Sequence, residues 1–396
     1  MTGRPWGTVR LGDYCTKIGS GATPRGGESV YQDIGVALIR SQNVYNGQFE
    51  MDGLAHLSEE HADQLIGATV ERGDVLLNIT GDSVARSCRV PEDVLPARVN
   101  QHVAIIRPKT AHFDSRFIGY FFISPFMQDT MLSLAGSGGT RKALTKEMIE
   151  RFDVPRPPRP VQARIADILA AYDDLIENNQ RRMALLEGAA RHLYREWFVG
   201  LRFPGHEHTR ITNGVPEKWE RKSLGAVARN FDRLRVPLSV FERELRPGQY
   251  PYHGAAGILD HIDGFLFDGR YLLVGEDGTV QAPSGTAMLQ LVENRFWVSN
   301  HAHVLTGSIV STEFLYCLLS FYAISGHVTG VAQPKVTQAS LNRVPVVVPT
   351  RTLREEFQEV VASLFSERFV LQRQNERLLA ARDLLLPRLM SGEKAV

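Results

Sequence analysis

The pattern of apolar and polar positions becomes regular shortly after Val161. Between Ile165 and Trp197, apolar residues recur at alternating spacings of four and three, and Asn179 is the polar exception. This heptad spacing is typical of a helix that packs along another helix, and a polar residue inside such a seam fixes its register. The positions of the seam are Ile165, Leu169, Tyr172, Ile176, Asn179, Met183, Leu186, Ala190, Leu193 and Trp197.

A second heptad pattern occupies the last part of the sequence. Polar Glu367 and Gln374 interrupt it, and Pro387 is expected to bend or end the helix, because proline removes a backbone donor and clashes with the preceding turn. Each stretch alone could be an ordinary buried helix, but two such helices in one chain most simply pair with each other as an intramolecular coiled coil. The apolar positions of the second stretch are Phe357, Val360, Leu364, Leu371, Leu378, Ala381 and Leu385.

The remaining sequence predicts a mixed α/β (α+β) fold. Short apolar runs bounded by Gly, Asn or Asp indicate strands, and longer periodic runs indicate short helices. Long helices do not alternate with strands, which argues against a doubly wound sheet. The expected strands are Val36–Ile39, Asp74–Ile79, Val103–Ile106, Tyr271–Val274 and Val344–Val348, and the expected helices are Ser58–Leu65, Phe117–Leu134 and Thr312–Phe321.

The chain contains an internal repeat, which is its most informative feature. The globular parts differ in length: Thr145 lies 139 positions after Trp6, but Thr337 lies 118 positions after Trp219. In the segments that follow, matched residues of the two repeats keep a nearly constant distance from one another along the sequence. Each repeat is therefore a variable globular part attached to a helix of fixed length, as expected for related units that bind different targets. The matched pairs are Trp6 and Trp219, Leu11 and Leu224, Gly12 and Gly225, His102 and His301, Thr145 and Thr337, Arg151 and Arg343, Pro157 and Pro349, and Arg191 and Arg382.

This repeat predicts four segments. Residues 1–155 form a first globular domain, residues 156–200 a central helix, residues 201–350 a second globular domain and residues 351–396 a closing helix.

Composition narrows the class of protein. The chain of 396 residues carries 45 Lys and Arg against 44 Asp and Glu, so any binding to nucleic acid must depend on a few well-placed cations, with further positive charge supplied by partners. Its three cysteines are widely spaced, which suits a reducing compartment and no disulfide framework. Because it also lacks an apolar run long enough to span a bilayer, we expect a cytoplasmic protein without membrane contact.

Catalytic motifs are missing from the sequence. It contains neither a phosphate-binding P-loop nor the Asn/Asp-Pro-Pro-Phe/Tyr tetrapeptide of adenine methyltransferases. Glu217 lies too close to Glu220-Arg221-Lys222 for a nuclease site, and His301 and His303 have no further ligands nearby in sequence. We therefore expect neither a catalytic centre nor a metal site.

Two loops combine small residues with cations ahead of an expected helix start, a combination that suits phosphate binding through backbone N–H groups. An ordinary capped helix with solvated charges is the alternative for each loop. The first offers Ser137, Gly139, Thr140, Arg141 and Lys142, and its counterpart in the second repeat offers Gln333 and Lys335.

Further polar residues follow the expected strands. Asn, Gln and Arg can address base edges and Ser or Thr can address phosphates, although each residue alone could be an ordinary turn residue. These DNA-binding candidates are Asn78, Thr80, Asp82, Ser83, Arg86, Asn100, Gln101 and His102 in the first repeat, and Asn300, His301 and His303 in the second.

The order and duplication of these segments resemble the specificity subunit of type I restriction-modification systems. The two halves open with Trp6 and Leu11-Gly12, and with Val215-Pro216-Glu217-Lys218-Trp219 and Leu224-Gly225. The first domain closes with LTKEMIERFDVPRPP (144–158). The helices contain AARHLYREWF (189–198) and AARDLLLPRLMSGE (380–393). The family usually opens its helix with Gln. Gln162 supplies this residue in the first half, but Arg354 replaces it in the second.

The resemblance implies two target-recognition domains joined by two long antiparallel helices with an approximate twofold repeat. Each domain is expected to read one half of a bipartite, asymmetric double-stranded DNA site, and the helices to set the gap. The chain itself would catalyse nothing and bind no cofactor. It would recruit two modification (methyltransferase) subunits, which bring S-adenosylmethionine, and through them restriction subunits, which use ATP and Mg²⁺. A scaffold that binds only protein is the alternative.

Overall fold

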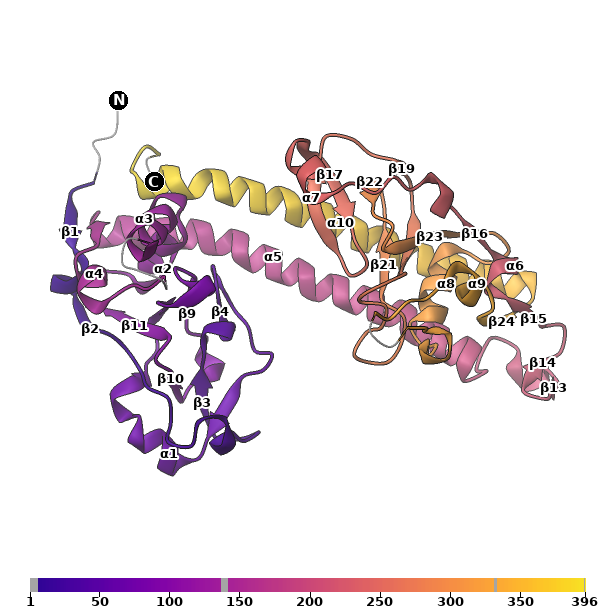
Figure 1. Cartoon of the computed structure of the whole chain (residues 1–396), viewed down its shortest axis with the longest axis horizontal. Helices are drawn as coiled ribbons and strands as arrows, with labels where there is room; N and C mark the ends of the chain where they lie inside the picture. The colour runs from indigo at the N-terminus through magenta and orange to yellow at the C-terminus, as the bar shows by residue number, and fades with distance from the viewer. Residues whose placement is uncertain (1–5, 137–141, 331–332, 395) are drawn as a thin grey trace. The chain divides into compact units, whose positions relative to one another are not determined.

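The computed structural model describes residues 6–136, 142–330, 333–394 and 396, which form two compact units (Figure 1). The first unit comprises the chain up to Glu177 together with Asn375–Val396, and the second comprises Asn178–Gln374. Each unit therefore contains one globular part and one portion of each long helix, α5 (Arg159–Tyr194) and α10 (Arg351–Met390). No helix within the described ranges is long and apolar enough to cross a membrane.

The globular part of the first unit is built on two four-stranded sheets. One has the antiparallel order β2 (Cys15–Ser20), β11 (Val103–Pro108), β8 (Val75–Asn78), β9 (Ser87–Arg89). The other has the order β6 (Ala55–Leu57), β3 (Val36–Ile39), β10 (Ala97–Val99), β7 (Thr69–Val70), in which β3 and β10 are parallel. Smaller pairs and helices complete it: β1 (Thr8–Arg10) with β12 (Asp153–Pro155), β4 (Val44–Tyr45) with β5 (Gln48–Phe49), α1 (Glu59–Gln64), α2 (Ser115–Ile123), α3 (Pro125–Gly136) and α4 (Lys146–Glu150).

The second unit repeats this strand order. Its first sheet runs β16 (Ala228–Asn230), β23 (Ala302–Gly307), β20 (Tyr271–Gly275), β21 (Leu289–Val292). Its second sheet runs β18 (Ile258–Ile262), β17 (Pro247–His253), β22 (Arg295–Val298), β19 (Phe267–Asp268), and β17 and β22 are again parallel. Smaller elements are β13 (Ile211–Thr212) with β14 (Val215–Pro216), β15 (Glu220–Ser223) with β24 (Pro345–Val348), α6 (Leu224–Val227), α7 (Val240–Glu244), α8 (Thr312–Leu319) and α9 (Gln338–Asn342).

Residues paired by the sequence repeat have the same structural roles in the two units. Thr145 accepts a hydrogen bond from the backbone at the start of α4, and Thr337 does so at the start of α9. A Cβ atom added at Gly12 would lie 3.0 Å from Glu150 Cβ, at the end of α4. A Cβ added at Gly225 would meet the last residue of α9 at the same distance. The predicted mixed α/β repeat is therefore confirmed.

In the first unit, α5 and α10 pack antiparallel. Arg382 of α10 forms an ion pair with Asp173 of α5, with 2.7 Å between Nη1 and Oδ1. The Asp173 carboxylate also accepts a hydrogen bond of 2.7 Å from the hydroxyl of Tyr120 on α2, so it joins both helices to the globular part. Burial and the adjacent carboxylate raise the pKa of Tyr120, which keeps this hydroxyl protonated. Deeper in the seam, Asn375 donates to the carbonyl of Ile176 at 3.1 Å.

In the second unit, the remaining portions of the helices pack in the same antiparallel sense. Arg182 pairs with Glu367 at 2.6 Å, and Glu187 of α5 pairs with Arg368 of α10 at 3.4 Å. Glu187 also accepts a hydrogen bond of 2.5 Å from Tyr316 on α8, so a tyrosine joins the globular part to both helices here as well. Every predicted seam position of the central helix is buried or half-buried, which confirms the coiled-coil prediction.

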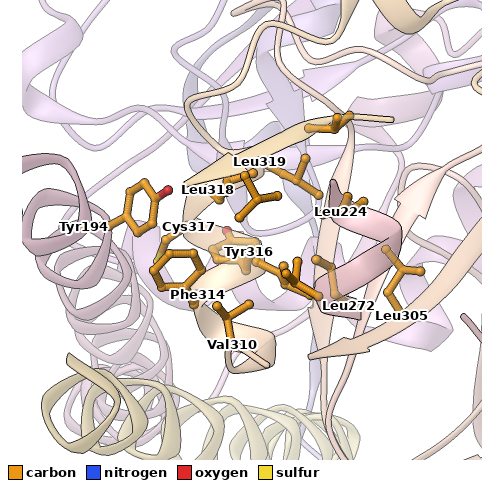
Figure 2. Close-up of a cluster of buried hydrophobic side chains, with 14 of the residues drawn as sticks. Tyr194, Leu224, Leu272, Leu305, Val310, Phe314, Tyr316, Cys317, Leu318 and Leu319 are labelled. Atoms are coloured by element: carbon orange, nitrogen blue, oxygen red, sulfur yellow. The ribbon is translucent and has the colours of Figure 1, made fainter. Parts of the chain in front are cut away.

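The core of the second unit lies between its first sheet and the helices. Figure 2 shows Phe314 and Cys317 of α8 between Tyr194 of α5 and Leu272 of β20, and all four are buried. The rings of Phe314 and Tyr194 meet edge to face, with centroids 5.1 Å apart. This packing fixes the globular part on its helices through the apolar face of α8.

Two sequence expectations about helices are wrong, and a third is met only in that α10 ends within one turn of Pro387. The stretch expected as one helix at Phe117–Leu134 is two helices, because Ser124 adopts an extended conformation before Pro125, where a helical residue would clash with the proline ring. In α10, Val360 is exposed and Val361 is buried instead, because the seam there advances by four residues from Phe357. Helix α10 also continues past Pro387 to Met390, since the exposed proline lies in its last turn.

Candidate nucleic-acid interface

Three distant segments of the first unit meet where its two sheets join. Residues 100–102 link β10 to β11, residues 79–81 leave β8, and residues 142–143 precede α4. The Ile79 amide donates to the His102 carbonyl at 3.0 Å, and the Gly81 amide donates to the Lys142 carbonyl at 3.0 Å. We call this place the first junction and define it by Thr80, Gln101, His102 and Lys142.

Thr80, His102 and Gln101 of the first junction form a chain of hydrogen bonds. Thr80 Oγ1 lies 2.6 Å from His102 Nδ1, and the Gln101 amide nitrogen lies 3.1 Å from His102 Nε2. Because the amide donates to Nε2, Nδ1 carries the ring proton and donates to the Thr80 oxygen. Thr23, which the sequence patterns did not single out, donates to Gln101 Oε1 at 2.5 Å. Among the described residues, neither the Thr80 hydroxyl proton nor the second Gln101 amide proton has an acceptor, so both can serve a ligand.

The other DNA-binding candidates of the first unit lie outside this chain of hydrogen bonds. Asn78 is fully buried and donates to the carbonyls of Ser41 and Val44, and Asn100 is 8% exposed and accepts from the His102 amide at 3.0 Å. These two side chains shape the junction and do not line its surface. Arg86 lies over the ring of Tyr45, and Asp82 and Ser83 occupy the turn Gly81–Ser83. Ser137, Gly139, Thr140 and Arg141 lie outside the described residues.

The second unit builds the same arrangement with other side chains. The Gly278 amide donates to the Pro334 carbonyl at 3.1 Å, and the Glu276 amide donates to the His301 carbonyl at 2.8 Å. The imidazole of His301 contacts the carboxylate of Asp277. Asn300 and Gln333 are exposed beside them, as is Lys335, whose Nζ lies 3.3 Å from a Glu276 carboxylate oxygen. We define the second junction by Asp277, His301, Gln333 and Lys335.

The backbones of the two junctions correspond, although Lys142 matches Pro334 and Lys335 matches Ala143. Gly81 and Gly278 both adopt the left-handed conformation, with φ of 74° and 72°, which a residue with a side chain rarely adopts. Thr80 therefore corresponds to Asp277, just before each glycine. Sequence comparison found the histidines but missed Asp277 and Thr23. Asp277 could have been found, because a glycine follows it directly, as a glycine follows Thr80. Thr23 lies in a loop that has no recognisable match in the second repeat.

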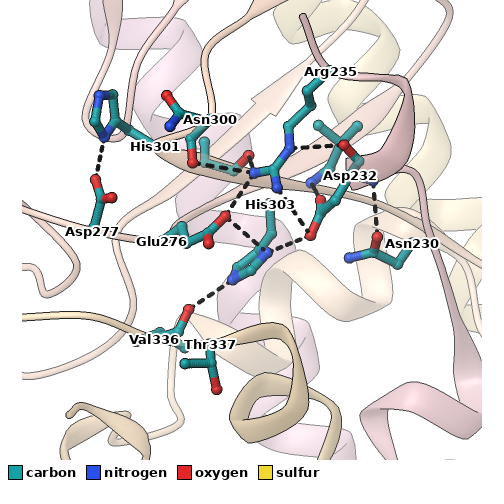
Figure 3. Close-up of polar contacts among 12 residues, drawn as sticks. Asn230, Asp232, Arg235, Glu276, Asp277, Asn300, His301, His303, Val336 and Thr337 are labelled. Carbon is teal, nitrogen blue, oxygen red and sulfur yellow. Dashed lines mark hydrogen bonds and ion pairs between the residues drawn. The ribbon is translucent and has the colours of Figure 1, made fainter. Parts of the chain in front are cut away.

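His303, which the sequence placed among the DNA contacts, lies beneath the second junction. Its side chain is 1% exposed and bonds to Asp232 and to the Val336 carbonyl (Figure 3). Asp232, Glu276 and His303 offer ligand atoms within 4.8 Å of one another, an arrangement compatible with a metal. Cationic side chains already face both carboxylates, however: Arg235 lies 2.7 Å from Glu276 and 3.6 Å from Asp232.

A family model for the "Type I restriction modification DNA specificity domain" matches residues 3–187 and 216–367. The chain belongs to this family. Membership identifies DNA-sequence recognition within a type I restriction-modification system as its role, in preference to that of a protein-only scaffold. The two matched stretches cover the two repeats, so each junction belongs to one specificity domain.

Similar proteins are named as specificity subunits of type I restriction systems. The chain is 27% identical to the Type I restriction enzyme MjaIX specificity subunit of Methanocaldococcus jannaschii, over 76% of this chain and 74% of the relative. It is 20% identical to the HindI specificity subunit of Haemophilus influenzae, over 90% and 94%. The crystal structure of the S subunit from M. genitalium shares the fold, with a TM-score of 0.59 at 14% identity over 97% of this chain and 96% of that one.

Lys142 and Lys335 are the exposed junction cations suited to phosphate contacts. We expect Lys142→Ala and Lys335→Ala each to weaken binding of all DNA duplexes to the same extent, and to reduce the slope of log K against log salt by about 0.9. Lys109→Ala is the control, because this lysine donates to the Asp13 carbonyl away from the junction. Fluorescence anisotropy over a salt series measures the slope. An unchanged slope, or altered preference at a single base, would contradict a phosphate contact.

Proposed function

We propose that each unit reads one half of a bipartite, asymmetric DNA site through its junction, and that α5 and α10 set the gap between the halves. The observation that carries this proposal is the recurrence of one three-segment junction in both units with different side chains at matched positions. A common frame with different side chains is what two readers of different sequences require.

The chemistry of the junctions suits base edges in the major groove. Gln101 can pair its amide with adenine through two hydrogen bonds, and a carboxylate such as Asp277 can accept from the amino group of cytosine. Lys335 and Lys142 suit the phosphates beside those bases. Because Thr80 in the first junction is matched by the carboxylate of Asp277 in the second, the two half-sites should differ in sequence.

The helices offer surfaces for the modification subunits. Exposed apolar residues remain on α5 and α10 in both units: Leu175, Leu379 and Leu384 in the first, and Leu185, Val360 and Val370 in the second. Both units thus expose apolar side chains on the helices, and we propose that one modification subunit docks on the helices of each unit.

In this proposal the chain supplies recognition and assembly, and the chemical steps belong to its partners. The modification subunits would methylate adenine with S-adenosylmethionine, and restriction subunits would use ATP and Mg²⁺ for cleavage. The support is the family membership together with the contacts at both junctions, where the polar groups serve hydrogen bonding and ion pairing.

Selection from a random duplex library tests this function. The purified chain, alone and with its cognate modification subunits, is incubated with the library, and bound DNA is separated by gel shift and sequenced. We expect the complex to select two short blocks separated by a gap of fixed length. A single continuous block would contradict the two-reader arrangement. Tight binding of modification subunits without any sequence preference would favour a protein-only scaffold.

A further inference from the structure

The second unit contains a buried polar cluster that has no counterpart at the matching place among the described residues of the first unit. Its members are His303, Asp232, Glu276 and Arg235, whose side chains are 1%, 8%, 14% and 13% exposed (Figure 3). The cluster lies directly beneath the second junction, because Glu276 immediately precedes Asp277 and its carboxylate also pairs with Lys335 at 3.3 Å.

His303 joins two segments of chain through its two ring nitrogens. Nδ1 lies 2.6 Å from a carboxylate oxygen of Asp232, and Nε2 lies 2.7 Å from the Val336 carbonyl. Both partners are hydrogen-bond acceptors, so His303 bridges them through the two sides of its ring. Burial alone would raise the pKa of Asp232, but the hydrogen bond and charge of His303 lower it below its usual value.

Arg235 and Asp232 extend the cluster to the strands that carry the junction. Arg235 donates to Glu276 at 2.7 Å and to the Ala302 carbonyl at 2.7 Å, and Asp232 accepts from the Val304 amide at 2.8 Å. The segments bearing Asp277, His301 and Lys335 are therefore held by one set of charge-assisted hydrogen bonds, which are shorter and stronger than neutral ones.

Strand registers identify the matching residues of the first unit. Ile106 pairs with Val75 and Ile18, and Leu305 pairs with Leu272 and Asn230, so these two sets are equivalent. Counting from them gives the first-unit residues that match the cluster: Ser20 for Asp232, Thr23 for Arg235, Ile79 for Glu276 and Ala104 for His303. Uncharged residues thus occupy the same place in the first unit, so the fold itself does not require a charged cluster there.

We infer that His303 is a positioning residue for the second half-site, which it serves by fixing the orientation of Asp277, His301 and Lys335. This inference rests on the proposed two-reader function. Buried charge networks contribute little net stability compared with apolar packing, but in some proteins they favour one conformation. A reader of base edges needs that property. Recognition of the second half-site therefore depends on the cluster, whereas recognition of the first does not.

The test compares His303→Ala with a matched core variant, Val304→Ala, in the complex with modification subunits. Val304 is fully buried on the same strand, so its truncation lowers stability while leaving the polar contacts in place. Selection from the random duplex library should show at least a tenfold loss of base preference in the second half-site for His303→Ala. The first half-site should be unchanged, and Val304→Ala should keep both preferences.

A fourfold variant keeps the test decisive if His303→Ala does not fold. Asp232→Ser, Arg235→Thr, Glu276→Ile and His303→Ala together install the residues that the first unit uses at this place. This variant should fold, as judged by near-ultraviolet circular dichroism, and should lose the second half-site preference.

The possible outcomes separate the inference from the proposed function. Retention of the second half-site preference by either variant, or its equal loss in Val304→Ala, would overturn the role of His303. The unmodified complex should keep its second half-site preference after dialysis against EDTA. Loss of that preference would also overturn the role of His303, because it would show that a cation occupies the cluster. Absence of a bipartite motif from the unmodified complex would instead refute the two-reader function.

Discussion

Exchanging residues 1–155 for the corresponding segment of a relative with another target is expected to change one half of the recognised sequence and to leave the other half and the gap unchanged. The exchange ends between β12 and α5, so both long helices and the whole second junction are retained. Each mismatched base pair costs about 1–3 kcal/mol, so a half-site of several base pairs should shift preference by orders of magnitude. Selection from a random duplex library reads both halves in one measurement.

The reciprocal exchange of residues 201–350 is the control and should change only the other half. Chimeras should keep Tyr120, or Tyr316 in the reciprocal case, because these hydroxyls join the exchanged part to the helices. A change in both halves after a single exchange would show that the junctions do not read independently.

Removing one heptad from each helix is expected to shorten the preferred gap without abolishing binding. Residues 174–180 and 371–377 are suitable, because the Ile176–Asn375 hydrogen bond is then removed as a pair while the Asp173–Arg382 ion pair stays. Seven residues correspond to about 10 Å of helix and a phase error of about 20°. This length equals about three base pairs, but each base pair also turns the duplex by about 36°. We therefore expect the preferred gap to shorten by about one to three base pairs.

Removal of five residues from each helix is the contrasting variant. The deletion rotates the part of each helix after the cut by about 140° relative to the part before it. The apolar seam beyond the cut then no longer faces the partner helix. Binding to duplexes of every gap length should then be lost. If the seven-residue deletion keeps the original gap, the helices do not determine the spacing.

The helices and the duplicated core could be predicted because their signals are local or periodic. Heptad spacing identified the buried face of α5 and of the π-helical turn Arg195–Val199 that follows it, from Ile165 to Trp197. Matched pairs such as Thr145 and Thr337 identified equivalent helix starts. The break at Ser124 was missed because apolar residues continue on both sides of it, although Pro125 was a visible signal. Val360 was chosen over Val361 because a three-residue and a four-residue step fit the sequence pattern equally well.

The candidate site was predicted in part. Thr80, Gln101, His102 and Lys142 were chosen from three separate segments, and the structure brings those segments together. Sequence spacing could not show that Asn78 and His303 face inward, because this depends on which strands pair and in which register. For the same reason the sequence gave no signal for Asp232 or Arg235. Asp232 lies 71 positions from its contact His303, and Arg235 lies 67 positions from its contact Ala302.

Gln162 and Arg354 show how one replacement alters a shared frame. Gln162 is fully buried and connects the Asp114 amide with the carbonyls of His112 and Pro157. Arg354 at the matching position contacts the Ile309 carbonyl, and it lines a cavity of about 410 Å³ with Ser311 and Gln358. The two helix starts therefore make different contacts although the strands beside them match.

The tyrosine contacts on the helices have a mechanical consequence. Asp173 accepts from Tyr120 and pairs with Arg382, and Glu187 accepts from Tyr316 and pairs with Arg368, so in each unit one carboxylate holds a globular part and both helices. A reader that tilts to accommodate an ill-fitting half-site must either break the tyrosine bond or carry both helices with it. Strain from a poor match is thereby passed to the surface on which partner subunits would rest.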